Sequence, residues 1–168
     1  MNNYSVFHQS RIKQLYTVRD GWIRKTYQLT DGSFSYGMLS YSGFFDPVVQ
    51  IDTADTTWIL RKTGFSNMEV VDPHGKVTAF IERKWFSSKT IFTAVDGFVA
   101  IHYKPSFWRR AYEWVTEEGQ VLIVQETQGF YHVDHFIYAD LTYRHPYMLL
   151  LTFLGLEFNL RRRRGAAA

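Results

Sequence analysis

Turn signals recur at a fixed interval through the middle of this 168-residue chain. Gly75, Gly97 and Gly119 follow acidic residues and are 22 residues apart. Aspartate and glycine suit tight turns because Asp bonds its own backbone and Gly accepts positive φ. Halfway between these turns lie segments that combine cations, aromatic residues and serine or glycine. The phenylalanines of this second set are 21 residues apart: Phe44, Phe65, Phe86 and Phe107. The spacing predicts a chain that reverses about every 11 residues, in a hairpin repeat of about 22 residues.

The segments between these turns have the composition of short β-strands. They are rich in β-branched and aromatic residues: VTAFIE (77–82), TIFTAV (90–95), FVAIHY (98–103), AYEWV (111–115) and VLIVQE (121–126). In the first of them Val77, Ala79 and Ile81 would share one face of the strand. Regular short strands predict an antiparallel barrel or sandwich, with room for about twelve strands counted from Val6.

The end of the chain departs from this rhythm. PYMLLLTFLGLEFNL, residues 146–160, is apolar on every side of a helix, and such a helix is buried on every side. In a β-rich protein the place for it is inside the barrel. We therefore predict a mainly β fold: a closed antiparallel barrel of about twelve strands around a C-terminal helix at about 146–162. Residues 1–164 would form this single domain, and 165–168 a disordered tail.

The composition of the chain limits the cellular compartments and the partners that we expect. The chain has no cysteine, which excludes disulfides and thiolate metal sites and fits a reducing compartment. MNNYSVFHQSRIKQL lacks the apolar core of a signal peptide, and residues 146–160 fall short of the ~20 needed to span a membrane. We therefore expect a cytoplasmic protein without a transmembrane span. The net charge of +3 includes four arginines at 161–164, so overall charge gives little support to nucleic acid as a partner.

The hairpin rhythm, the terminal helix and RKWFS (83–87) with AVDG (94–97) resemble the tubby C-terminal-like superfamily, from about Tyr4 to Arg164. The resemblance is greatest to its LURP-one-related and phospholipid scramblase branch, which includes small bacterial members. It implies a twelve-stranded barrel around a central helix. It also implies membranes as partners, since tubby domains bind phosphoinositide headgroups through surface cations and scramblases act on membranes.

The chain also departs from that superfamily. It lacks the palmitoylated cysteines and the acidic calcium segment of scramblases, and 146–160 does not reproduce the tubby signature. No single binding residue of the family therefore transfers by motif.

Consecutive turns of a meander alternate between the two ends of a barrel. The Asp/Gly turns would then make one end acidic, with Asp31, Asp52, Asp55, Asp72, Asp96, Glu117 and Glu118. The other end would be basic, with Arg61, Lys62, Arg83, Lys84, Lys89, Lys104, Arg109 and Arg110 as anion-binding candidates. Interface aromatics would join them there: Phe65, Trp85, Phe86, Phe107 and Trp108. The helix would run from the acidic end to the basic one and carry Arg161–Arg164 to it.

Such a basic–aromatic end suits an anionic phospholipid or phosphoinositide surface, contacted peripherally at the inner face of a membrane. It equally suits single-stranded nucleic acid or an acidic protein. A third interpretation is structural: the aromatics plug the barrel, and the cations only keep its edges soluble. An open barrel carrying a small hydrophobic ligand is a further alternative.

No GxSxG, Walker, GxGxxG or HExxH motif occurs, so we expect a non-enzymatic domain without catalytic residues or cofactors. HVDH (132–135), with His102 as a third ligand, suggests a metal site only weakly, because divalent sites need three or four converging ligands. We expect no metal, and surface or hydrogen-bonded histidines. Glu157 is the one carboxylate expected to be partly buried, in an ion pair with Arg161 at i+4.

Overall fold

The computed structural model describes residues 4–7, 15–20, 26–43, 47–64, 67–83, 88–128, 134–139 and 145–166. Twelve strands are followed by one α-helix in this part of the chain. The strands are β1 (Leu15–Asp20), β2 (Thr26–Thr30), β3 (Ser35–Ser42), β4 (Val48–Thr53), β5 (Thr57–Lys62), β6 (Met68–Val71), β7 (Val77–Arg83), β8 (Thr90–Ala94), β9 (Val99–Tyr103), β10 (Ala111–Val115), β11 (Val121–Gln128) and β12 (Asp134–Ala139). The helix is α1 (Met148–Ala166). A mainly β fold with one C-terminal helix is thus confirmed.

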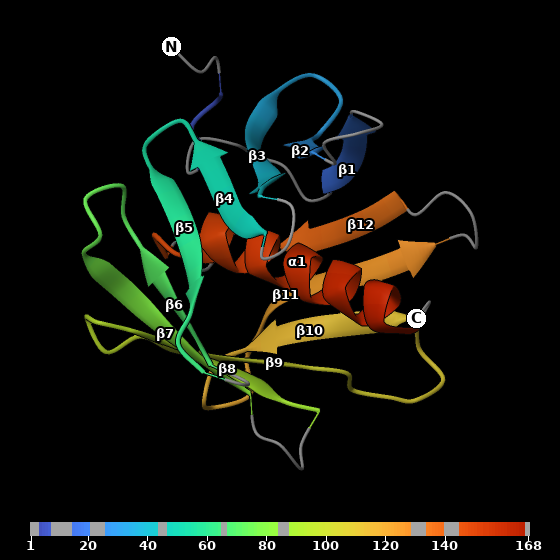
Figure 1. Ribbon diagram of the computed structural model, residues 1–168. Helices are drawn as coiled ribbons and strands as arrows, with labels where there is room; N and C mark the ends of the chain where they lie inside the picture. The colour runs from blue at the N-terminus through green and yellow to red at the C-terminus, as the bar shows by residue number, and fades with distance from the viewer. Residues whose placement is uncertain are drawn as a thin grey trace.

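The strands form one antiparallel sheet in which neighbours in the chain are neighbours in the sheet. The exception is β1, which pairs with β2 on one side and with β12 on the other. This last link is short: Leu15 faces Ile137 and Tyr16 faces Phe136, whereas β11 and β12 share six residue pairs. The sheet curls so that its strands lie on several sides of α1 (Figure 1).

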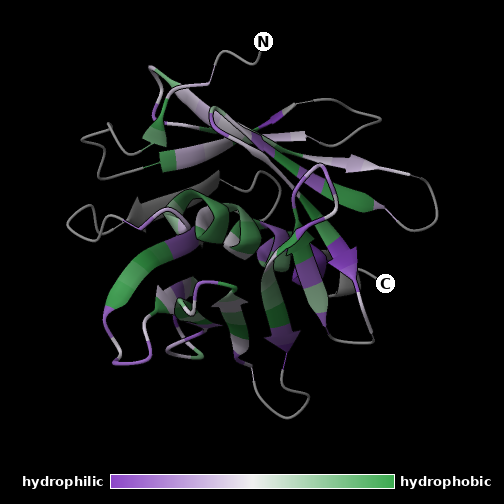
Figure 2. Cartoon of the chain, turned by 90° about the vertical axis from the view of Figure 1, so that its left-hand side faces the viewer, coloured by the Kyte–Doolittle hydropathy of each residue, from purple (hydrophilic) through white to green (hydrophobic). Residues whose placement is uncertain are grey.

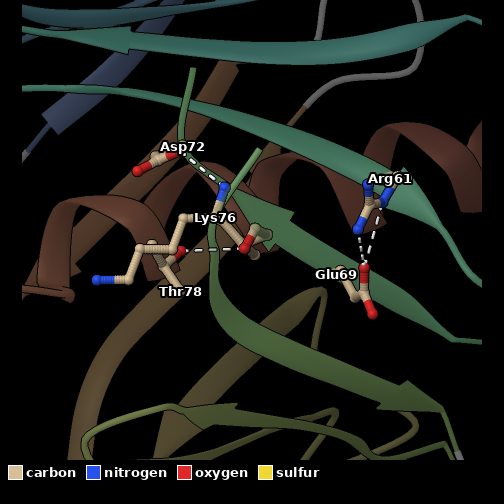
Figure 3. A network of polar contacts seen from close by, with 6 residues as sticks. Arg61, Glu69, Asp72, Lys76 and Thr78 are labelled. Atoms are coloured by element: carbon tan, nitrogen blue, oxygen red, sulfur yellow. Dashed lines mark hydrogen bonds and ion pairs between the residues drawn. The ribbon is translucent and has the colours of Figure 1, made fainter. Parts of the chain in front are cut away.

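The predicted Asp/Gly turns are present, and their side chains hold them. The Asp72 carboxylate accepts hydrogen bonds from the backbone N–H groups of His74 and Lys76, both at 2.9 Å, as Figure 3 shows for Lys76. The Asp96 carboxylate accepts one from Phe98 at 3.1 Å. Gly75 and Gly97 adopt φ of 83° and 94°, which side chains disfavour. The Asp and Gly residues from which we predicted these turns therefore stabilise them, by side-chain hydrogen bonds and by positive φ.

Strand alternation determines what faces α1. In β7, Ala79 and Ile81 are buried, while Phe80 and Glu82 are exposed, as the sequence pattern predicts. In β9 the buried pair is Ala100 and His102. We expected strands from Val6 onward, but residues 4–7 are not in a strand. The first strand among the described residues starts at Leu15.

α1 fills the space inside the curled sheet. Its side chains are buried on all sides from Met148 to Asn159, and Leu150, Phe153 and Leu154 are fully buried. Figure 2 shows its first turns as hydrophobic and its last turns as hydrophilic. Among the described residues, α1 lacks the continuous apolar length that a membrane-crossing helix has.

The bounds of the helix differ from those predicted. Pro146 and Tyr147 form a turn, in which the N–H of Met148 bonds to the carbonyl of His145, so the helix begins at Met148. It continues to Ala166, since arginine and alanine are good helix formers. Residues 165–166 therefore belong to the helix and not to a disordered tail, while 167–168 lie outside the described residues.

Candidate functional site

α1 runs from the end of the Asp/Gly turns to the end of the basic segments. At its start, Tyr147 bonds to the Asp96 side chain, and burial together with this carboxylate raises the pKa of the Tyr147 hydroxyl. The His145 ring stacks on Phe98 at 3.8 Å between centroids. At its other end, Arg162 lies within electrostatic reach of Arg83. The last turns of the helix therefore bring their arginines to the predicted basic end.

In the structure, most described cations of the predicted basic end fall into two groups. Lys62 lines a pocket together with Arg161 of α1, and Arg83 lies near Arg162 of α1; we call these four residues the mouth. Lys104, Phe107, Trp108, Arg109 and Arg110 belong to the β9–β10 loop, residues 104–110. Arg61 and Lys89 lie outside both groups. Phe65, Lys84, Trp85 and Phe86 lie outside the described residues.

The side chains of Arg61 and Lys89 each interact with a residue of a strand. The Arg61 Nη2 lies 2.5 Å from the Glu69 carboxylate on β6 (Figure 3). The Lys89 Nζ lies 5.9 Å from the centroid of the Tyr103 ring. Arg61 and Lys62 are neighbours in the sequence but point to opposite faces of β5, because side chains alternate along a strand. The two candidates therefore lie on different faces of the sheet.

The β9–β10 loop presents two aromatic side chains to solvent. Phe107 is 84% exposed and Trp108 is 90% exposed, the highest values among the large hydrophobic residues described. Their rings meet edge to face at 5.7 Å. The Lys104 ammonium donates to the Phe107 carbonyl at 3.0 Å and lies 5.2 Å from the centre of its ring. Arg109 and Arg110 follow and are exposed. The loop therefore joins three cations to an exposed apolar pair.

Arg162 is a half-buried residue of the mouth. Its guanidinium lies 4.2 Å from the centre of the Tyr112 ring, a cation–π contact, and donates to the Asn159 side-chain carbonyl at 3.3 Å. Burial lowers the pKa of Arg162, and the nearby positive charge of Arg83 adds to this. Tyr112 is the second residue of β10, two residues after Arg110, so Arg162 lies beside the strand that follows the β9–β10 loop.

Glu157 lies at the inner side of the mouth. It is fully buried and accepts hydrogen bonds from the Tyr41 hydroxyl and from the Nε of Arg161. The predicted ion pair with Arg161 is confirmed. The role of Tyr41 was not predicted, because it lies 116 residues away in the sequence. Glu157 is not the one buried carboxylate, since Asp52 is also buried, where it accepts from Gln50 and Thr57.

A pocket opens beside this carboxylate. Its volume is about 240 Å³, and the described residues that line it are Tyr41, Pro47, Val49, Lys62, Glu157 and Arg161. β3, β4, β5 and α1 contribute to it together with the segment before β4.

His102 is the residue whose environment was predicted wrongly. It is fully buried, and neither ring nitrogen has a hydrogen-bond partner in the part of the chain described. Its ring stacks on Tyr112 at 5.5 Å and meets Trp114 at 4.8 Å and Phe158 at 5.4 Å. Burial, with a smaller effect of Arg162, lowers the pKa of His102 to about 3. It is a neutral core residue and not a surface or hydrogen-bonded one.

The metal hypothesis finds no geometric support within the described ranges, where no three potential ligands converge. His132 of the HVDH segment lies outside them.

The chain matches no protein-family model, no curated protein and no solved structure. The class of protein is therefore defined by its fold and by two surface features. The fold is a β-sheet curled around its own C-terminal helix, and the features are the cationic mouth and the exposed aromatic pair of the β9–β10 loop.

Proposed function

We propose that this protein is a non-enzymatic binding domain that contacts anionic phospholipid surfaces through its β9–β10 loop. The observation that carries the proposal is the exposure of Phe107 and Trp108, 84% and 90%, between Lys104 on one side and Arg109 and Arg110 on the other. Aromatic side chains settle at the membrane–water interface, and cations are attracted to anionic headgroups.

The magnitudes fit reversible, peripheral binding. Each Lys or Arg near an anionic surface contributes about 1 kcal/mol, so the three loop cations would contribute about 3 kcal/mol. Lys104 donates one hydrogen bond within the loop, but an ammonium has three donors. The mouth arginines add attraction at longer range, which salt screens over about 10 Å. Salt-sensitive binding to the cytoplasmic face of a membrane follows from these terms.

The resemblance to the tubby C-terminal-like superfamily supports the same proposal. Membership of that superfamily would make the sheet a closed barrel, in which the short β1–β12 pairing joins the two ends of the sheet. A carrier of hydrophobic ligands is less well supported, because α1 occupies the interior in which a carrier holds its ligand.

Co-sedimentation with lipid vesicles tests the proposal. We expect binding to vesicles that contain phosphatidylserine, none to phosphatidylcholine alone, and weaker binding at physiological salt than at low salt. The double variant Phe107→Ser/Trp108→Ser should lose about tenfold or more in partitioning, since each buried aromatic contributes more than 1 kcal/mol. Phe34→Ser is the matched control, because Phe34 is 57% exposed in an Asp/Gly turn at the other end.

Absence of binding at low salt would overturn the proposal. Equal losses in the loop variant and in Phe34→Ser would also contradict it, because the loop would then have no special role. Binding that single-stranded DNA abolishes by competition, without any preference for anionic over neutral vesicles, would favour a nucleic-acid partner instead.

A further inference from the structure

The β9–β10 loop is not closed by its own backbone. β9 and β10 pair as far as Tyr103 and Glu113, and no backbone-to-backbone hydrogen bond lies within residues 104–110, all of which the structure describes. The Asp/Gly turns differ, since in one of them the N–H of Asp72 bonds to the carbonyl of Lys76 at 3.0 Å. A loop without such bonds samples many conformations unless other contacts offset the entropy cost of ordering it.

The Lys104 side chain makes a contact of this kind. Its ammonium donates to the Phe107 carbonyl at 3.0 Å and lies 5.2 Å from the centre of the Phe107 ring. One cationic group therefore contacts both the backbone and the side chain of the same residue, by a hydrogen bond and by a cation–π interaction. Pro105 lies between the two residues, and its ring fixes its own φ angle and restricts Lys104 to extended conformations. These constraints together define the path of the chain from Lys104 to Phe107.

This path determines where the aromatic pair lies. The rings of Phe107 and Trp108 meet edge to face at 5.7 Å, and the two side chains are 84% and 90% exposed. Exposed aromatic rings gain free energy by folding back onto apolar surface, because each ring can bury a large area. A contact that holds both the carbonyl and the ring of Phe107 opposes such a rearrangement.

We propose that Lys104 is a positioning residue, which holds the β9–β10 loop in the conformation that presents Phe107 and Trp108 to an anionic lipid surface. This role rests on the proposed membrane contact and deepens it. An ordered loop binds more tightly than a mobile one, because its side chains lose less conformational freedom at the interface. The ammonium has two further N–H donors for headgroups, so positioning adds to the electrostatic attraction of Lys104.

Amide ¹⁵N relaxation of the free protein tests the positioning role without any membrane. We expect the backbone of Ser106, Phe107 and Trp108 to have order parameters near the rigid value of about 0.85 in the wild type. In Lys104→Met, which keeps the aliphatic chain and removes the donor, they should fall below about 0.6. Arg109→Met is the matched control, because Arg109 is an exposed cation of the same loop, and this variant should leave the order unchanged. Equal order in the wild type and in Lys104→Met would overturn the proposal.

Partitioning onto phosphatidylserine vesicles then separates positioning from charge. Lys104→Met and Arg109→Met each remove one positive charge from the loop, so the two variants should depend on salt in the same way. We expect Lys104→Met to bind about fivefold or more weakly than Arg109→Met at every salt concentration, because two aromatic side chains must then be ordered on binding.

Coinciding binding curves for the two variants would overturn the proposal, since Lys104 would then act through its charge alone. A wild type that does not bind these vesicles at low salt would instead overturn the membrane contact itself. The relaxation measurement separates the two failures, because it reports on the loop of the free protein and involves no lipid.

Discussion

At the scale of single residues, His102 shows what the sequence does not reveal. A lone histidine in a strand such as FVAIHY is compatible with either face, and the face is set by the register of the hairpin. In the structure it lies between Tyr112, Trp114 and Phe158, where no described group bonds to it. Glu157 was easier to predict, because its partner Arg161 lies at i+4 in the same helix, whereas Tyr41 is brought to it by the fold alone.

The burial of His102 predicts a pH-dependent stability. The pKa of its ring is about 3 in the folded protein and near 6.5 in the unfolded chain, so between these values the unfolded chain binds a proton that the folded protein does not. As the pH falls from 6.5 toward 3, the free energy of unfolding should therefore decrease by about 1.4 kcal/mol per pH unit from this group. Chemical unfolding of the wild type and of His102→Leu at several pH values measures this.

Carboxylates also titrate in this range, so the informative quantity is the difference between the two proteins. The groups around His102 are the rings of Tyr112, Trp114 and Phe158 and the guanidinium of Arg162, and no carboxylate contributes to its pKa shift. His102→Leu should have the shallower pH dependence and should gain relative stability as the pH falls. Parallel curves for the two proteins between pH 6.5 and 4 would show that His102 is protonated in the folded state.

At the scale of elements, α1 is held by close contact with the sheet. Two glycines allow this approach: Gly37 of β3, against which the Phe153 ring lies, and Gly155 of α1, against which Gln125 and Trp114 lie. Gln125 also donates to the Thr152 carbonyl of the helix at 2.8 Å. A helix apolar on all sides was predictable as buried, but which of its residues must be glycine depends on the neighbours that the fold supplies.

Gly155→Ala should therefore destabilise the protein, although alanine favours a helix by about 1 kcal/mol. A Cβ at this position would lie 1.7 Å from the Gln125 Oε1 and 2.9 Å from the Trp114 Nε1. Moving Gln125 away would break its buried bond to Thr152. Overpacking of this kind typically costs about 1–3 kcal/mol, which we expect as the net loss in urea unfolding. Gly64→Ala is the control, since a Cβ there meets nothing within 4 Å and should change stability by less than about 0.5 kcal/mol. A more stable Gly155→Ala protein would mean that α1 can move away from β10 and β11.

At the scale of the whole molecule, the sequence predicted the strands, the Asp/Gly turns and the direction of the helix. These features depend on local chemistry: turn residues bond their own backbone, and an apolar segment must be buried. The distribution of the basic site was predictable only in part. The β9–β10 loop keeps its cations and aromatics together because they are consecutive, whereas Arg61 and Lys62 separate because strand neighbours face opposite ways. The pocket was not predictable, because three strands and the segment before β4 converge on the helix to form it.

The central claim is that the exposed aromatic pair of the β9–β10 loop enters an anionic membrane surface. Tryptophan quenching by phosphatidylserine vesicles with brominated acyl chains tests it most directly. The other described tryptophans, Trp58 and Trp114, are buried in the sheet, so Trp108 is the described tryptophan placed to meet the quencher. Trp22 and Trp85 lie outside the described residues, so both are first replaced by phenylalanine. In that background we predict quenching when Trp108 is present and its loss in Trp108→Phe, which retains an aromatic ring and should still bind the vesicles. Equal quenching in the two proteins, with both bound, would contradict the account, because another surface would then face the lipid.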